Sequence, residues 1–388
     1  MPLKLPIYMD HHATTPVDQR VLDEMIPYFN QKFGNAASID HSHGAEASDA
    51  VERSREKIAV AIHARPEEII FTSGATESDN IAIFGIAEKY AAEGDHIITC
   101  ATEHKAILDT CKRLEAWGKK ITYLPVDSYG TVDLEALKNS ITNRTILISI
   151  MMANNEIGTI APVHEIGKIA KEYEILFHTD AAQAFGHMPV DVRALNINIM
   201  SISSHKMYGP KGVGALYVSR SNPKANVAPI IYGGGHERGM RSGTLNVPGI
   251  VGFGKAIEIA LKEMSSDNKR NASRTKKMLD IFSEELRVEL NGHPTQRLSH
   301  NLNIYLKGIE NKALINILKN DISISAGSAC TTSKVEPSHV IKALGFGEER
   351  AYSSLRFGLG RFNVEEEIEY AIRCVIENSK KLRRISSD

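Results

Sequence analysis

Short apolar runs alternate with longer amphipathic segments between residues 68 and 219. The short runs have the length of β-strands, and several are apolar throughout, which is typical of strands covered on both faces of a sheet. Strands separated by helices of this length indicate right-handed crossovers and a mostly parallel sheet. The predicted strands are residues 68–72, 96–100, 121–125, 145–152, 175–179, 197–202 and 214–219, and the predicted helices between them are residues 76–92, 104–117, 134–141 and 163–173.

Two helices are expected before this series. Thr15 followed by Pro16 favours an N-cap with proline at the first helical position, and apolar residues recur at helical spacing from Val17 to Phe29. The second helix is expected over residues 45–62.

The pattern becomes more polar after residue 254, where a long helix with a basic stretch at residues 262–277 continues into residues 278–290. Further strands and a final pair of helices are expected at residues 301–306, 322–325, 336–344 and 364–382. We therefore predict an α/β protein with two domains. The large domain, residues 16–261, carries a mostly parallel seven-stranded sheet, and a smaller α+β domain comprises residues 1–15 and 262–388.

The composition is ordinary for a globular protein, with 388 residues, 42% of them hydrophobic and 24% charged. A formal net charge of −1 removes the electrostatic argument for nucleic acid or an anionic membrane as the main partner. No apolar run approaches the ~18–20 residues of a membrane span, and residues 1–6 lack an apolar signal core. The four cysteines are scattered without metal-ligand or redox spacing, so a reducing, cytoplasmic location is expected.

Lys206 ends an apolar run of strand length and is followed by several glycines. Burial at such a position lowers the pKa of a lysine by up to ~3–5 units and frees the amine as a nucleophile. Schiff-base chemistry on a carbonyl cofactor requires such an amine. A surface lysine that extends its ammonium into solvent is the alternative, but the neighbouring Ser203 and His205 favour a functional site.

An anion-binding turn is expected at residues 72–80, where a strand runs into a helix. Gly74 and the first helical residues offer backbone N–H groups and hydroxyls to a phosphate. The helix dipole contributes only ~0.3–2 kcal/mol, so a dianionic phosphate also requires side-chain donors, for which Ser203 and His205 are candidates. An ordinary capping box is the alternative interpretation.

Other polar residues follow predicted strands at the carboxyl edge of the sheet, where open α/β sheets bind their ligands. Asp180 suits a protonated pyridine nitrogen; a metal site shared with His178 is the alternative, although no third ligand is evident. His104 is expected either to stack on a flat cofactor or to cap a helix. Asn155 follows a further strand.

Residues 325–333 are small and polar and include a glycine, so this segment is expected to be an exposed, mobile loop. Free cysteine is normally buried, which makes Cys330 on such a loop a candidate reactive thiol. The other three cysteines lie in predicted strands and helices and are expected in the core. Arg356 lies in an apolar context that suits a bidentate contact with a substrate carboxylate.

Together these segments resemble the pyridoxal-phosphate-dependent cysteine desulfurases of the NifS/IscS type, which are class-V aminotransferase-like enzymes of fold type I. The resemblance covers residues 8–382 and is closest to the IscS branch. The motifs that carry it are Ala13-Thr14-Thr15-Pro16, residues 72–80, Thr102-Glu103-His104-Lys105, Asn154-Asn155-Glu156-Ile157-Gly158, Asp180-Ala181-Ala182-Gln183, Ser203-Ser204-His205-Lys206, Arg241-Ser242-Gly243-Thr244, Gly327-Ser328-Ala329-Cys330-Thr331 and Ser354-Leu355-Arg356-Phe357.

The resemblance implies that Lys206 holds pyridoxal 5′-phosphate and removes the substrate Cα proton. His104 would stack on the cofactor ring, Asp180 would pair with the pyridine nitrogen, and Gln183 would contact the ring hydroxyl. The remaining cofactor contacts would come from Ala75, Thr76, Asn155, Ser203 and His205, and from Thr244 of the other subunit of a homodimer.

The resemblance also implies that Asn155 and Arg356 bind the carboxylate of L-cysteine and that Cys330 attacks its sulfur, which leaves L-alanine and a persulfide on Cys330. The sulfur would pass to an iron–sulfur scaffold or another acceptor protein, for iron–sulfur cluster assembly and for tRNA thiolation. No metal is required for this chemistry, and transient iron–sulfur ligation by Cys330 on a scaffold is left open. Neither direct nucleic-acid binding nor membrane binding is expected.

A selenocysteine lyase or another fold-type-I enzyme is the first competing interpretation, and a non-catalytic interaction protein is the second. The sequence departs from the family pattern at Ala36, Met152 and Ser204, where proline, histidine and glycine are common. The sequence ends at Asp388, earlier than IscS proteins whose C-terminal tail helps to bind the scaffold. Scaffold binding is therefore the implication that this sequence supports least.

Overall fold

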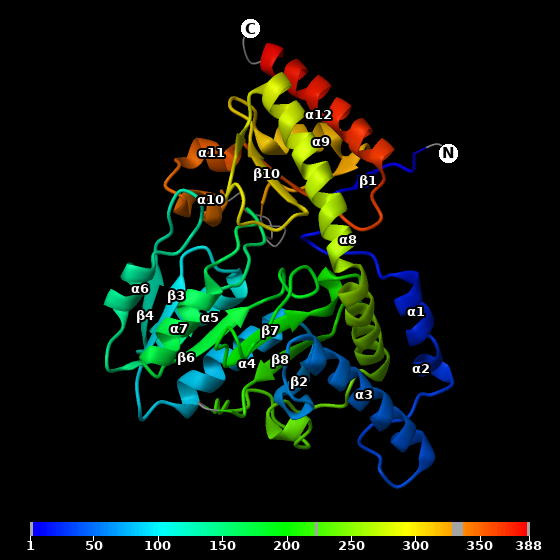
Figure 1. Cartoon of the computed structure of the whole chain (residues 1–388), viewed down its shortest axis with the longest axis vertical. Coiled ribbons are helices and arrows are strands. Elements are labelled where there is room, and N and C mark those ends of the chain that lie inside the picture. The colour runs from blue at the N-terminus through cyan, green and yellow to red at the C-terminus, as the bar shows by residue number, and fades with distance from the viewer. Residues whose placement is uncertain (1–2, 222–223, 328–336, 386–388) are drawn as a thin grey trace.

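Seven strands form the central sheet of the larger lobe, in the spatial order β2-β8-β7-β6-β5-β3-β4 (Figure 1). In this computed structural model, which describes residues 3–221, 224–327 and 337–385, these strands are β2 (Ile69–Thr72), β3 (His96–Cys100), β4 (Lys120–Leu124), β5 (Thr145–Ser149), β6 (Leu176–Asp180), β7 (Ile199–Ser203) and β8 (Gly214–Val218). The strands from β4 to β7 are parallel, and β8 is antiparallel to both of its neighbours. The predicted fold class, with its mostly parallel seven-stranded sheet, is confirmed.

Alternate residues of β2 and β8 enter different cores, as a pleat of period two requires. Ile69 and Phe71 pack in the core beneath one face, whereas Ile70 packs in the core on the other face. One face is covered by α4 (Ala75–Lys89) and α5 (Lys105–Ala116). The other is covered by α3 (Ser42–Ala61), α6 (Leu134–Ser140), α7 (Val163–Glu172) and the first half of α8. Burial on both faces explains why several of the strands are apolar throughout.

The N-terminal helix differs from its prediction. The chain forms two short helices, α1 (Gln19–Met25) and α2 (Pro27–Asn30), and the N-cap of α1 is Asp18, whose carboxylate accepts from the backbone N–H of Arg20. Thr15 is not a cap, because its hydroxyl donates to the carbonyl of His205 at 2.9 Å and accepts from the N–H of Tyr208 at 2.7 Å. These hydrogen bonds hold the N-terminal strip (residues 3–15) against the segment that carries Lys206.

The smaller lobe contains an antiparallel sheet of β12 (Ser354–Gly358), β10 (Asn301–Tyr305) and β9 (Glu289–Leu290), and β1 (Ile7–Tyr8) pairs in parallel with β11 (Ile322–Ser323). Its helices are α9 (Asn311–Leu318), α10 (His339–Ala343), α11 (Glu348–Tyr352) and α12 (Glu365–Ile385). Short 3₁₀ turns elsewhere cover Pro66–Glu68, Ser204–Lys206 and Glu237–Gly239. The lobe has its own apolar core, in which β10 and β12 pack against α12 and the end of α8.

One helix of 40 residues, α8 (Val247–Leu286), runs through both lobes (Figure 1). Its first half packs on α1 and α3, and its second half packs on α12. The predicted domain boundary between residues 261 and 262 falls inside this helix, and the division into two domains stays a prediction.

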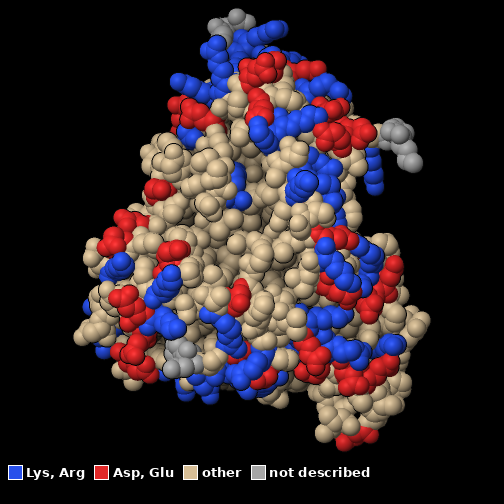
Figure 2. Space-filling view, viewed as in Figure 1, with Lys and Arg blue, Asp and Glu red and all other residues tan. Residues whose placement is uncertain are grey.

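Charged side chains of both signs are intermixed around the face of the molecule in Figure 2, and the net charge is −1. Within the described ranges, every helix is too short or too polar to span a bilayer.

Candidate active site

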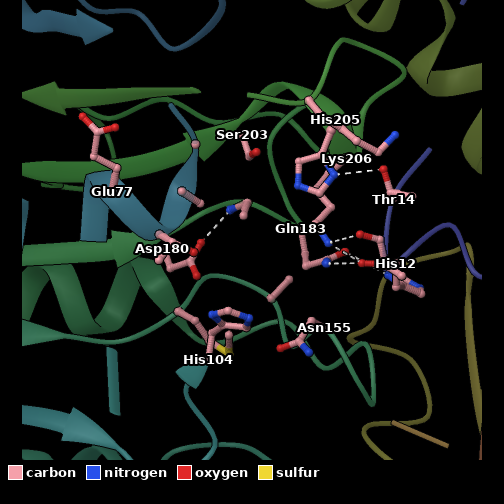
Figure 3. A pocket seen from close by; sticks show the side chains of 18 of the residues that line it. His12, Thr14, Glu77, His104, Asn155, Asp180, Gln183, Ser203, His205 and Lys206 are labelled. Carbon is pink, nitrogen blue, oxygen red and sulfur yellow. Dashed lines mark hydrogen bonds between the residues drawn. The ribbon is translucent and has the colours of Figure 1, made fainter. Parts of the chain in front are cut away.

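A pocket of about 480 Å³ opens at the carboxyl edge of the central sheet (Figure 3). Strands β2, β6 and β7 end at this edge, and the loops after β3 and β5 reach it from the same side, because these strands share one direction. The predicted site residues that line the pocket are Ala75, Thr76, His104, Asn155, Asp180, Gln183, Ser203, His205, Lys206 and Arg356. The fold therefore brings together side chains from most of the length of the chain.

Lys206 enters the pocket from the 3₁₀ turn that follows β7. Its Nζ donates to the carbonyl of His12 at 2.5 Å and to the carbonyl of Ala13 at 2.8 Å. Its own carbonyl accepts from Nε2 of His187 at 2.8 Å. The amine is thus anchored to the N-terminal strip at the wall of the pocket rather than extended into solvent.

Asp180 is the last residue of β6 and is buried, with Oδ1 accepting from the backbone N–H of Ala182 at 2.8 Å. Burial raises the pKa of this carboxyl, and the positive charges of His104 and Lys206 act against that rise. Behind it, burial and the neighbouring Asp180 raise the pKa of Asp79 well above its usual range. A buried carboxylate in this position favours a cationic partner from the pocket.

The predicted anion cradle, formed by the N-terminus of α4 with Ser203 and His205, lies on the other side of the pocket. The N-cap of α4 is Gly74, which has no side chain and a φ of 154°, so the first N–H groups of the helix stay available. Ser203 and His205 line the same end of the pocket, and Nδ1 of His205 lies 3.1 Å from the hydroxyl of Thr14. The capping-box interpretation is wrong, since the N-cap offers no side chain, and the anion site stays a prediction.

The helix-cap interpretation of His104 is confirmed, and its stacking on a cofactor stays a prediction. His104 is the N-cap of α5, where its Nδ1 accepts from the N–H of Ala106 at 3.2 Å, and its ring lines the pocket next to Asp180 (Figure 3). His178, by contrast, is fully buried and bonds the hydroxyls of Ser149 at 2.8 Å and Ser201 at 3.0 Å. Those serine contacts explain this histidine without a metal.

Arg356 reaches the pocket from β12 of the smaller lobe and is 1% exposed. Nη2 lies 2.6 Å from a carboxylate oxygen of Asp10, and Nη1 donates to the carbonyl of Asn155 at 2.9 Å. The guanidinium is therefore held in a fixed orientation before any substrate arrives. Asp10 was not among the predicted residues, because its partner is 346 positions away in the sequence.

Two predicted site residues are not among the described residues that line this pocket. Thr244 is exposed on the surface of its own chain, and its expected reach to a neighbouring subunit stays a prediction. Cys330 lies outside the described residues, as does most of its segment. The expectation of an exposed segment is wrong for Ser325, which is 8% exposed and exchanges backbone hydrogen bonds with Arg356 at 2.7 and 3.2 Å.

The sequence interpretation missed His12, Lys211 and Glu77, which also line the pocket. Glu77 accepts from Ser73 N at 2.9 Å and pairs with Nε of Arg241 at 2.7 Å, so it anchors the turn that leads to Thr244. The sequence did contain one indication of this residue: Glu77 lies in the first turn of a predicted helix, where acidic side chains are favoured.

The fold and this pocket define a member of a known enzyme family. Residues 7–371 match the Aminotransferase class-V family, and the chain belongs to it.

Within the family, the chain is similar to proteins described as cysteine desulfurase IscS. It is 52% identical over 385 residues to IscS of Rickettsia conorii and to IscS of Rickettsia prowazekii, covering 99% of this chain and 93% of each relative. A solved NifS-like protein superimposes with a TM-score of 0.90 at 39% identity, covering 96% of this chain and 99% of its own. A structure described as SspA in complex with cysteine gives a TM-score of 0.82 at 38% identity, covering 92% of this chain and 100% of its own. The predicted resemblance to enzymes of the cysteine desulfurase type is confirmed.

Proposed function

We propose that this chain is a pyridoxal-phosphate-dependent cysteine desulfurase, which takes the sulfur of L-cysteine, releases L-alanine and holds the sulfur as a persulfide on Cys330. The proposal rests on one observation: a single pocket is lined by the amine of Lys206, the predicted anion cradle, the buried carboxylate of Asp180 and the fixed guanidinium of Arg356. Relatives that are 52% identical and described as cysteine desulfurases support the same reaction.

The residues of the pocket fit pyridoxal phosphate at both of its ends. The N-terminus of α4, with Ala75, Thr76, Ser203 and His205, would hold the phosphate. Asp180 would pair with the protonated pyridine nitrogen, which supplies the cation that a buried carboxylate favours. His104 would stack on the ring from the α5 side. When bound, the cofactor supplies a carbonyl carbon for amines and a ring that withdraws electrons from the substrate Cα.

The side chains of the protein would divide the remaining work. Lys206 would attach the cofactor covalently and then remove the Cα proton, because its Nζ lies at the pocket wall. Asn155 and Arg356 would bind the substrate carboxylate and keep water from that side. The thiolate of Cys330 would form an S–S bond with the substrate sulfur as the substrate Cβ–S bond breaks.

The deciding experiment is to load the purified protein with pyridoxal phosphate and supply L-cysteine. We expect equimolar L-alanine and persulfide, with sulfide released when a thiol reductant is present. The competing selenocysteine lyase would release alanine from L-selenocysteine and leave L-cysteine untouched, and another fold-type-I enzyme would release no alanine from either.

We further propose that the enzyme works as a cytoplasmic homodimer that passes sulfur to an acceptor protein for iron–sulfur cluster assembly, with tRNA thiolation as a second destination. A reducing compartment keeps an attacking thiol available. Arg241, anchored to the first turn of α4 through Glu77, leads into the exposed Thr244, which suits a contact with the neighbouring subunit.

Thr244→Ala tests the shared site. A hydrogen bond to a charged phosphate contributes about 1.5–3 kcal/mol, so the cofactor should leave the variant roughly 10–150-fold more readily. The measurement is loss of cofactor absorbance after dilution, with dimer content followed by sedimentation. Ser242→Ala, buried two positions earlier, is the control and should retain the cofactor. A monomer with full activity at high dilution would contradict the shared site.

Arg356→Gln tests substrate binding. Loss of a charge-assisted pair should weaken L-cysteine binding by roughly 10–150-fold, since such bonds contribute about 1.5–3 kcal/mol. Cysteamine lacks the carboxylate, so its affinity should be the same for the variant and the unaltered protein. Both affinities can be read from the visible spectrum of the bound cofactor, and an equal loss for the two ligands would contradict the assigned role.

A further inference from the structure

We propose that His12 is a positioning residue that fixes the amide of Gln183 as a hydrogen-bond donor to the cofactor, through a directional chain of hydrogen bonds that begins at Arg297. The inference rests on the proposed function, because it concerns the phenolic oxygen of pyridoxal phosphate. Its structural part, the direction of each bond, follows from the described side chains alone.

The direction is set at the far end by an arginine that can only donate. Nη2 of Arg297 donates to Oδ1 of Asn301 at 2.8 Å, which assigns the oxygen of this buried amide. Nδ2 of Asn301 then donates to the carbonyl of Glu156 at 3.1 Å, a group that can only accept. The orientation of Asn301 is thus determined from two sides.

The second hydrogen on Nδ2 of Asn301 meets Nε2 of His12 at 3.1 Å, so this ring nitrogen must accept. His12 is fully buried, and burial together with the positive charges of Arg356, His187 and Lys206 holds its pKa well below the usual range. A neutral ring that accepts at Nε2 carries its proton on Nδ1. Nδ1 therefore donates to Oε1 of Gln183 at 2.9 Å.

The same orientation of Gln183 follows independently from its other end. Its Nε2 donates to the backbone carbonyl of His12 at 3.0 Å, so the nitrogen and oxygen of the amide cannot be exchanged (Figure 3). Gln183 lines the pocket, and its second amide hydrogen makes no hydrogen bond within the described part of the chain. That hydrogen is left for a ligand.

Two further histidines hold the ring of His12 in place. His300 stacks on it with ring centroids 4.5 Å apart, and His187 stacks on the other side of His300 at 4.2 Å. His187 in turn bonds the carbonyl of Lys206. The stack therefore joins the residue that orients Gln183 to the turn that carries the reactive lysine.

The chemical consequence is a preference for one form of the cofactor. A fixed N–H donor stabilises an oxyanion at the phenolic position and makes that oxygen a weaker base. Without the donor, the proton shared between the phenolic oxygen and the nitrogen of Lys206 should be lost at a higher pH. The pH at which the visible absorption of the bound cofactor changes reports this directly.

Two substitutions separate the donor from the acceptor of His12. His12→Asn puts an amide nitrogen at the position of Nδ1 and keeps the donor to Gln183, whereas His12→Gln reaches the position of Nε2 and loses it. We expect the absorption midpoint to rise by about one pH unit, a tenfold change, in Gln183→Ala. It should rise in the same direction but by less in His12→Gln, where the backbone carbonyl of residue 12 still accepts from Nε2 of Gln183. His12→Asn should remain near the unaltered protein, as should His11→Gln, a control for a buried histidine that bonds Gly358 instead.

A midpoint unchanged in His12→Gln, or raised equally in His12→Asn, would overturn the proposal. In the Gln183→Ala background, His12→Gln should add no further shift; an additional full shift would also overturn it. If His12→Gln fails to fold, Asn301→Ala removes the preceding step, and an unchanged midpoint there gives the same refutation. An unaltered protein that shows no visible band with pyridoxal phosphate would overturn the proposed function itself, whereas a normal band with unmoved midpoints would overturn this inference alone.

Discussion

Lys206→Ala should fold but lose covalent cofactor and turnover, with kcat at least about 10⁴-fold lower, because one amine is expected to act as both the attachment point and the base. The carbonyls of His12 and Ala13 that now accept from Nζ face a pocket that admits water, so their loss of a partner is tolerable. The measurement is reduction with borohydride followed by peptide mapping, together with the alanine assay.

Lys211→Ala is the matched control for this prediction, since Lys211 is the other lysine that lines the pocket among the described residues. It should retain the covalent cofactor. A labelled peptide that contains any lysine other than Lys206 in the unaltered protein would refute the assignment.

Cys330→Ser should still bind L-cysteine, visible as a shift in the cofactor spectrum, yet accumulate no protein persulfide. The other cysteines are poor nucleophiles: burial raises the pKa of Cys100 to about 11 and that of Cys111 to about 12, and it also raises that of Cys374. The thiolate is the reactive form, so these three are expected to stay protonated at neutral pH. Alanine release should fall by at least about 10²-fold, the effect of losing a positioned reacting group.

Mass spectrometry after one turnover measures the persulfide. Cys374→Ser is the control, because Cys374 is the most accessible of the three described cysteines, and it should leave persulfide formation unchanged. Persulfide sulfur on Cys100, Cys111 or Cys374 with Cys330 unmodified would refute this assignment.

The central sheet was predictable because several of its strands are apolar on both faces and the segments between the strands have the periodicity of amphipathic helices. The two-residue strands β1 and β9 were not, since pairing between distant segments defines them rather than any local pattern, whereas β11 lies within the predicted strand at residues 322–325. The N-terminal cap was predicted wrongly at Thr15, whose hydroxyl is used by His205 and Tyr208. A local signature was overridden there by contacts about 190 residues away.

The residues predicted for the pocket follow strand ends, where sequence and topology agree, and most of them line it. His12 and Asp10 could not be assigned in this way, because their partners, Asn301 and Arg356, lie 289 and 346 positions away in the sequence. A histidine or an aspartate in a polar segment is compatible with many roles, and the sequence does not reveal which residue it contacts in the fold. Cys330 was predicted from composition and resemblance, and its role stays a prediction.

The continuity of α8 has a mechanical consequence. Its first half packs in the core of the larger lobe and its second half packs in the core of the smaller lobe. The helix therefore connects the two lobes rigidly. A rotation of one lobe against the other would have to bend α8. It would also have to break the hydrogen bonds that join the N-terminal strip to the turn of Lys206. The backbone therefore fixes the distance between Arg356 on one lobe and Asp180 on the other. Only the side chains of the pocket are then left to adjust to a bound substrate.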